Sequence, residues 1–211
     1  MEKEQRMVND LKPVLYDQSL IGDFVVYDVE RNIDIKDGLR KDLTTIYPLL
    51  LGNEFPKTFG HYHQSNNPEL YEVIEGQALF LCQKHSGNYL EIDEAYLIKA
   101  ESGDSIIVLP GFSMTTINYG QSNVLMSNWV NNEIKNEYQL FSELQGACYY
   151  VLKGENSSFK FLKNNKYKKV PELIQLKPKK LLPELANLDF LISPEKYQNF
   201  LKVDNLYEKL N

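Results

Sequence analysis

The feature that most restricts the fold is a succession of short segments, from Phe24 onward, that are rich in Val, Ile, Leu, Thr and Tyr. Gly, Asn, Asp or Pro separates each segment from the next, and KHSGN (84–88) has the composition of a hairpin turn. The segments are FVVYDVE, LTTIYPLLLG, LYEVIEG, QALFLCQ, YLEIDEAYLI, SIIVLP, TTINYG and NVLMSNWV, with further candidates at ACYYVLKG and FKFLKN. Many short strands at regular spacing are typical of a sandwich or a closed barrel, because closure removes exposed sheet edges. The sequence therefore predicts an all-β domain.

The same pattern predicts how the chain is organised. The first twenty residues are expected to be helical or irregular, with Pro13 as a breaker. Near the other end, SPEKYQNFL begins with a Ser cap followed by Pro and Glu, which is typical of a helix start. No internal repeat or low-complexity linker indicates a second domain. We expect an N-terminal extension over 1–23, one barrel over 24–165, and a largely helical tail over 166–211 that packs on the barrel or on a partner.

Composition argues against several classes of partner. The net charge of −6 does not suit a polyanion, so we expect no nucleic acid. No segment is apolar and long enough for a membrane span, and the N-terminus lacks the apolar region of a secretory signal. The two cysteines, Cys82 and Cys148, form no metal-like pair, and a reduced, cytoplasmic protein is the simplest interpretation. One disulfide between them stays open at this point.

The segment GHYHQSNNPELYEVIEG contains the residues that indicate chemistry. Side chains alternate faces along a strand, so His61 and His63 point the same way about 7 Å apart. The turn QSNNP lets the chain return as a second strand, on which Glu69, Tyr71 and Val73 share one face. An isolated His-x-His is often structural, but a carboxylate across a hairpin completes a set that suits Fe, Mn, Zn or Ni. We therefore expect His61, His63 and Glu69 to bind one divalent metal ion.

These residues also resemble a known family. His-x-His, followed by Glu and then Gly76, resembles the first cupin motif, and Gly103-Asp104 with residues 110–118 resembles the second. More narrowly, TTIYPLLLGNEFPKTFGHYH and ELYEVIEG are similar to the cupin-type glucose-6-phosphate isomerases best known from archaea, over about residues 40–140. The resemblance implies a single cupin (jelly-roll) β-barrel that interconverts glucose 6-phosphate and fructose 6-phosphate. It also implies one divalent ion per subunit and a homodimer.

Individual site residues follow from the same resemblance. Glu69 matches the family's metal-binding carboxylate and candidate proton carrier, and Tyr71 matches a pocket tyrosine, so both are expected to be catalytic. The family's motif also provides a set that contacts the sugar phosphate through hydroxyls, polar side chains and a backbone amide. In this chain the set is Thr44, Thr58, Gly60, Tyr71, Asn136 and Tyr138. Without the family, a single Thr or Tyr would more readily be interpreted as structural.

The chain departs from the family at three of these positions. Met114 stands where the family has a third histidine ligand, Val130 where it has a tyrosine, and Asn136 where it has a histidine. A thioether is a weak ligand for such ions, so Met114 is expected either to line the pocket or to fill the core. A second hypothesis is therefore a sugar-phosphate-binding cupin without turnover, acting as a sensor or an accessory subunit. A third is another metal cupin enzyme, which the match at Thr44, Thr58 and Gly60 makes less favoured.

Overall fold

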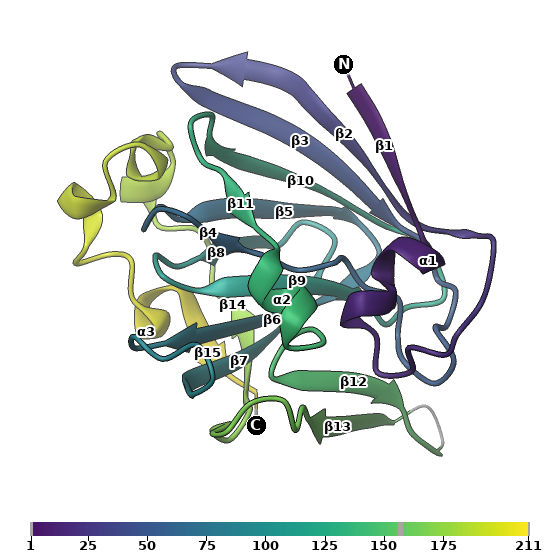
Figure 1. Cartoon of the computed structure of the whole chain (residues 1–211). Helices are drawn as coiled ribbons and strands as arrows, with labels where there is room; N and C mark the ends of the chain where they lie inside the picture. The colour runs from purple at the N-terminus through teal and green to yellow at the C-terminus, as the bar shows by residue number, and fades with distance from the viewer. Residues whose placement is uncertain (1, 156–157, 211) are drawn as a thin grey trace.

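The computed structural model describes residues 2–155 and 158–210, and it consists of two β-sheets that face each other (Figure 1). One sheet has the strand order β1-β2-β3-β10-β5-β8 and the other the order β15-β14-β7-β6-β9. The first sheet contains β1 (Glu2–Met7), β2 (Val25–Lys36), β3 (Leu39–Ile46), β10 (Val124–Asn131), β5 (Glu69–Glu75) and β8 (Ser105–Val108). The second contains β15 (Tyr207–Lys209), β14 (Ile174–Pro178), β7 (Ile92–Glu101), β6 (Gln77–His85) and β9 (Ser113–Asn118). The predicted all-β cupin barrel is confirmed.

Alternation of side chains between the two faces explains which residues enter the barrel. Along β3 the buried positions are Leu39, Asp42, Thr44 and Ile46, and Arg40 is half-buried on the face of Asp42 and Thr44. Strand β6 instead has a run of six buried residues, so both of its faces are covered. The predicted turn at KHSGN joins β6 to β7, as expected.

The N-terminal residues differ from the prediction of a helical or irregular segment. Residues Glu2–Met7 form β1, which pairs antiparallel with β2, and only α1 (Val8–Leu11) and the 3₁₀ helix η1 (Lys12–Val14) are helical. A buried ion pair holds this region in place: Lys57 Nζ lies 2.5 Å from Glu54 Oε1 and donates to the carbonyl oxygen of Val14 at 2.7 Å. The N-terminal strand β1 is therefore an edge strand of the first sheet, which the local sequence pattern did not indicate.

The tail packs on the barrel, but the prediction that it is largely helical is wrong, because it contains two strands and only short helices. Strand β14 adds to the second sheet by pairing parallel with β7, and β15 pairs with β14. Tyr207 anchors β15, because its hydroxyl accepts from the Ile107 amide at 2.9 Å and donates to the Ile107 carbonyl at 2.6 Å. The helices of the tail are only three or four residues long. They are η3 (Pro183–Leu185), η4 (Asp189–Leu191), η5 (Pro194–Tyr197) and α3 (Val203–Leu206).

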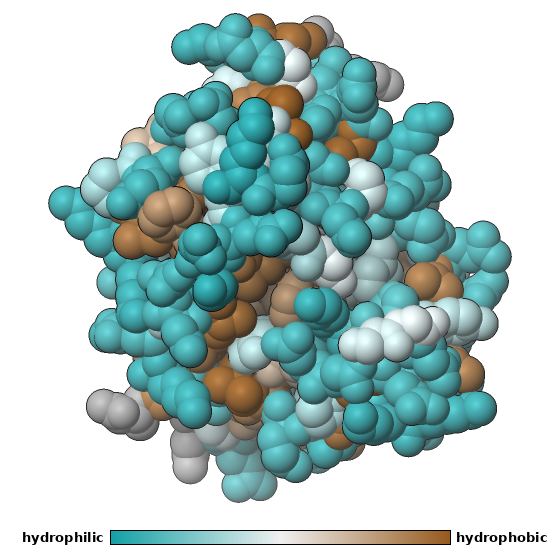
Figure 2. Space-filling model, turned by 90° about the vertical axis from the view of Figure 1, so that its left-hand side faces the viewer, coloured by the Kyte–Doolittle hydropathy of each residue, from teal (hydrophilic) through white to brown (hydrophobic). Residues whose placement is uncertain are grey.

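The remaining elements lie around the barrel. The β12 (Tyr149–Lys153) and β13 (Phe159–Lys163) pair matches the two further strands predicted from the sequence. The short strands β4 (Tyr62–His63) and β11 (Asn136–Glu137) pair with each other and lead to α2 (Gln139–Glu143). None of the helices in the described ranges is long and apolar enough to cross a membrane. Seen from the side on which the tail lies, the surface is mostly hydrophilic, with apolar side chains gathered in a hollow (Figure 2).

Candidate metal centre and active site

His61, His63 and Glu69 come together as predicted. The His61 and His63 Nε2 atoms are 3.3 Å apart, and Glu69 Oε2 lies 3.2 Å from His63 Nε2 and 3.6 Å from His61 Nε2. Three ligands on one ion, each bound at about 2.0–2.1 Å, would be separated by roughly 3.0–3.4 Å. The observed separations are therefore close to those of a facial ligand set, and these three residues form a group able to hold a metal ion.

Neighbouring polar groups fix the orientation of the three side chains. His63 Nδ1 lies 3.0 Å from the Asn67 carbonyl oxygen, which can only accept, so Nδ1 donates and a neutral ring directs the Nε2 lone pair at Glu69. Asn128 Nδ2 donates to Glu69 Oε1 at 2.6 Å, which leaves Oε2 facing the two imidazoles. Among the described residues, Glu69 Oε2 is buried without a hydrogen-bond donor. Three converging acceptors with no donor fit a divalent cation.

The charges of the three groups shift their protonation equilibria. Burial by itself would raise the pKa of Glu69, but hydrogen bonds and charge from the two imidazoles, when these carry a proton on Nε2, outweigh it and hold this pKa well below the ordinary range. Burial would lower the pKa of His63, and the hydrogen bond and charge of Glu69 outweigh that effect and raise it. Burial beside Glu69 raises the pKa of Tyr71 far above its usual value, so Tyr71 stays protonated and acts as a donor. Glu69 is therefore the ionised carboxylate of the site.

A cavity of about 60 Å³ adjoins this centre between the two sheets. Every residue predicted to contact substrate lines it, together with His61, Glu69 and Met114, whereas His63 borders a neighbouring hollow. Two further buried oxygens of the lining, Thr116 Oγ1 and Asn136 Oδ1, have no hydrogen-bond partner in the described part of the chain. Unpaired buried polar atoms are costly, so their concentration in one cavity favours a polar ligand there.

Gly60 and Thr58 have structural roles that the sequence did not reveal. Gly60 has a φ of +82°, and a Cβ at this position would overlap the ring of Phe141, so packing against the chain itself requires glycine. The Thr58 hydroxyl accepts a hydrogen bond from the Thr116 amide at 3.0 Å, and the Thr58 amide donates to the Thr116 carbonyl at 2.9 Å.

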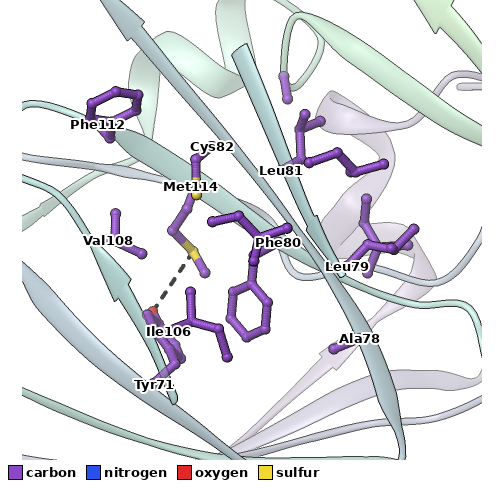
Figure 3. Close-up of a cluster of buried hydrophobic side chains, with 14 of the residues drawn as sticks. Tyr71, Ala78, Leu79, Phe80, Leu81, Cys82, Ile106, Val108, Phe112 and Met114 are labelled. Atoms are coloured by element: carbon purple, nitrogen blue, oxygen red, sulfur yellow. Dashed lines mark hydrogen bonds between the residues drawn. The ribbon is translucent and has the colours of Figure 1, made fainter. Parts of the chain in front are cut away.

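Met114 faces the pocket rather than only the core. Its backbone pairs with His61 through two hydrogen bonds of 3.1 and 3.2 Å, and it is only 3% exposed. The Tyr71 hydroxyl donates to Met114 Sδ at 3.7 Å (Figure 3). Met114, the position at which the family resemblance implies a third histidine, is thus directly beside a candidate metal ligand.

The two other departures also lie near the pocket. Val130 is buried and pairs with Arg40 across β10 and β3. Asn136 pairs with His63 across β11 and β4, and its Nδ2 donates to the Tyr138 hydroxyl at 3.1 Å.

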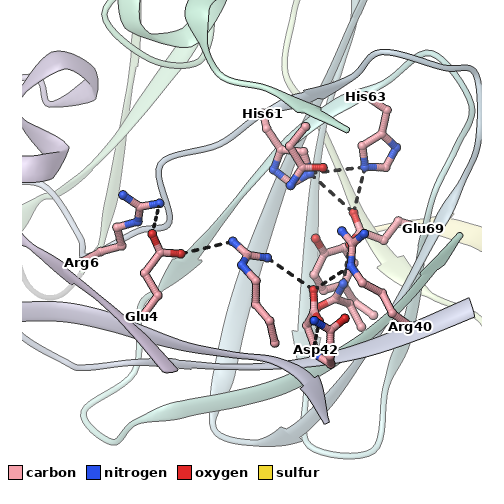
Figure 4. A network of polar contacts seen from close by, with 12 residues as sticks. Glu4, Arg6, Arg40, Asp42, His61, His63 and Glu69 are labelled. Atoms are coloured by element: carbon pink, nitrogen blue, oxygen red, sulfur yellow. Dashed lines mark hydrogen bonds and ion pairs between the residues drawn. The ribbon is translucent and has the colours of Figure 1, made fainter. Parts of the chain in front are cut away.

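A charged cluster in the pocket was missed from the sequence. Arg31, Arg40 and Asp42 line the cavity, and Asp42 Oδ2 lies 3.4 Å from Arg31 Nη1 and 3.2 Å from Arg40 Nε (Figure 4). The period-2 rule applied from Thr44 back along β3 would have placed Asp42 and Arg40 on the same face. Asn128 follows from the register, because it pairs with both Asp42 and Tyr71.

Comparison with known proteins decides the family. The family described as glucose-6-phosphate isomerase matches residues 5–169. The chain belongs to the glucose-6-phosphate isomerase family. Among curated relatives with that name, the protein of Thermococcus litoralis is 34% identical over 121 residues, which is 56% of this chain and 55% of that protein. The Thermococcus onnurineus relative is 34% identical over 127 residues, or 56% of this chain and 64% of the relative.

Other relatives match over a greater length. The glucose-6-phosphate isomerase of Pyrococcus abyssi is 28% identical over 166 residues, which is 78% of either chain. A solved oxalate decarboxylase–formate complex from Lactobacillus farciminis is similar at a TM-score of 0.42 and 15% identity, covering 55% of this chain and 31% of that one. The chain thus spans about half to two thirds of the first two relatives of the isomerase family, and most of the third.

Proposed function

We propose that the protein is a metal-dependent isomerase that interconverts glucose 6-phosphate and fructose 6-phosphate. The observation that carries this proposal is one cavity that adjoins the His61–His63–Glu69 set, is lined by His61 and Glu69 and by the family's substrate residues, and holds two unpaired polar oxygens. The relatives that the chain matches bear the name of this activity. The cytoplasmic location and the homodimer stay predictions from sequence and resemblance.

The chemistry requires a hydrogen to move between C1 and C2 of the sugar. A divalent ion held by His61, His63 and Glu69 would supply Lewis-acid stabilisation of the charge that develops on the sugar oxygens. Glu69 is the candidate base, because it is a buried carboxylate that lines the cavity and Asn128 fixes one of its oxygens. It would accept the proton from one carbon and return it to the other. A hydride shift would use the same residues, and both routes stay open.

Two groups on the pocket wall would orient the sugar. Tyr71 is a neutral donor next to Glu69, and Tyr138 lies against His61 with ring centroids 5.8 Å apart. Thr44 and Thr58 also line the cavity. These groups contribute mainly by positioning the substrate for the proton transfer.

A coupled assay tests the proposal. Protein purified without chelator is supplied with Fe(II), Mn(II), Zn(II) or Ni(II), and glucose 6-phosphate formed from fructose 6-phosphate is followed through a dehydrogenase. We expect turnover with at least one of these metals and loss of turnover in Glu69→Gln. Absence of turnover with every metal, in protein that binds the metal, would contradict the proposal and favour a sugar-phosphate-binding cupin without activity.

A further inference from the structure

Two arginines enter the pocket from neighbouring strands and share one carboxylate. Arg31 comes from β2 and Arg40 from β3, and both contact Asp42 Oδ2. Asp42 is nearly fully buried, with its side chain 3% exposed, whereas the side chains of Arg31 and Arg40 are 28% and 15% exposed. The second Asp42 oxygen accepts from the Asn32 amide at 2.8 Å. A buried carboxylate with this many donors holds both guanidinium groups in position.

The net charge of the pocket with a divalent ion bound favours an anionic ligand. Arg31 and Arg40 cancel Asp42 and Glu69, so a bound divalent ion leaves the cavity with an excess of about two positive charges. A phosphate monoester carries about −1.5 to −2 at neutral pH. The groups expected to hold the phosphate, Thr44, Thr58 and Gly60, are all uncharged. Charge-assisted hydrogen bonds are stronger than neutral ones, so a cation at this end would add most to phosphate binding.

The strand register distinguishes the two arginines. Val29 on β2 pairs with Thr44 on β3, so Arg31 is two strand residues, about 7 Å, from the level of Thr44. Arg40 is four residues from Thr44, about 13 Å, and pairs with Val130. The backbone of Arg31 therefore lies nearer the level of Thr44 than the backbone of Arg40 does, although both guanidinium groups meet at Asp42 Oδ2. Arg31 Nη2 contacts Glu4 at a long 3.5 Å, and Tyr138 lies within reach of the same guanidinium, so among the described residues its donors are only weakly engaged.

We propose that Arg31 binds the phosphate group of the substrate and that Asp42 is the positioning residue that holds its guanidinium. The proposal rests on the proposed function, since it assigns a specificity-determining residue to that same pocket. It assigns a cationic side chain to the phosphate, whereas Thr44, Thr58 and Gly60, the residues carried over from the family for this group, are uncharged.

Calorimetry with two ligands tests the role of Arg31. The ligands are a phosphorylated sugar acid and the same acid without phosphate, titrated into metal-loaded protein. Arg31→Gln should weaken binding of the phosphorylated acid roughly 10- to 100-fold and leave the unphosphorylated acid unchanged. The matched control is Arg6→Gln, because Arg6 bonds to Glu4 on β1 but does not line the pocket, and it should bind both acids like wild type.

The outcomes separate this proposal from the proposed function. If wild type binds both acids equally, no phosphate is recognised, and both proposals fail. If wild type prefers the phosphorylated acid and Arg31→Gln keeps that preference in full, only the role of Arg31 is wrong. Should Arg31→Gln fold poorly, Arg31→Lys keeps the charge but loses the planar pair of donors, and we expect several-fold weaker phosphate binding. Unchanged binding in that variant would also contradict the proposal.

Asp42→Asn distinguishes positioning from simple charge balance. If Asp42 only offset positive charge, its neutralisation would tighten binding of the phosphorylated acid. If it positions Arg31, the variant should bind that acid several-fold more weakly, although the pocket has become more positive. Thermal melting of the same sample checks that the protein is folded. Tighter binding would overturn the role of Asp42.

Discussion

Replacing Met114 by histidine tests the metal centre at its most unusual position. Met114 is buried, its backbone pairs with His61, and its sulfur contacts the Tyr71 hydroxyl. Because Met114 is paired with the candidate ligand His61, an imidazole there should complete a set of three histidines and one carboxylate. Nitrogen is a better ligand than a thioether for borderline divalent ions, so we expect tighter metal binding.

The magnitude follows from the added ligand and the burial. An extra protein ligand should raise metal affinity at least about tenfold, which is about 1.4 kcal/mol. The stabilisation caused by excess metal should exceed that of wild type by this same amount, which is roughly 3–6 °C in Tm for a domain of this size. Without metal, an imidazole buried in place of a thioether should lower stability by about 1–3 kcal/mol. The variant should thus melt below wild type when metal-free and show the larger shift on metal addition.

Thermal melting and metal titration measure these effects together. Met126→His is the matched control, because Met126 lines the same cavity but pairs with Val73, about 13 Å along β5 from Glu69. If the pocket is otherwise intact, the isomerase rate of Met114→His should equal or exceed that of wild type. If only the Met114→His variant turns over substrate, the loss of activity in wild type is due to the residue at position 114. Metal affinity no higher than in the Met126→His control would show that residue 114 does not face the ion.

Three further predictions concern the ligands, the pocket and the cysteines. His61→Ala should lose at least about tenfold in metal affinity by calorimetry. The control variant His85→Ala should bind metal like wild type. Unchanged affinity and stoichiometry in His61→Ala would refute the ligand assignment. Thr58→Val should lower both phosphosugar affinity and Tm, because the Thr58 hydroxyl also accepts a hydrogen bond from a backbone amide. Thr58→Ser should keep both. Equal phosphosugar affinity in wild type and Thr58→Val would exclude the hydroxyl from binding. Cys82 and Cys148 are free thiols, and burial raises the pKa of each to about 12. A thiol reagent at pH 8 should therefore label two groups only after the protein is unfolded. Rapid labelling of the native protein would contradict this prediction.

The ligand set could be predicted because it depends on short-range geometry. His61 and His63 are two residues apart, and a five-residue turn returns the chain to Glu69, so local alternation is enough to bring the three together. The strand segments were predictable for the same reason, since composition and turns are read within a few residues. The sequence did not show that His61 is held by a bridge to Met114 rather than by a long strand of its own.

The residues that were missed depend on irregular or long-range structure. The register of β2 and β3 shifts between Glu30 and Asp34, and Asn32 has a φ of +56°, which turns its amide toward Asp42. No local pattern signals that bulge or the place of Arg31 in the pocket. The tail was mispredicted because β14 pairs with β7, some eighty residues earlier in the chain, and a parallel pairing of that span leaves little trace in the sequence.

The metal set connects the two sheets, and this ties ligand binding to the closure of the barrel. His61 is attached to β9 of the second sheet through Met114, whereas Glu69 opens β5 of the first. Without a cation, the close approach of these groups depends on a proton at His63, whose pKa Glu69 raises. A bound ion takes the place of that proton and has no equivalent site in the unfolded chain, so its binding free energy adds to stability. Arg31 acts in the same direction from β2, because its contacts to Asp42 and Glu4 join the pocket to the N-terminal strand. The residues that would bind the substrate thus also hold together the walls between which it binds.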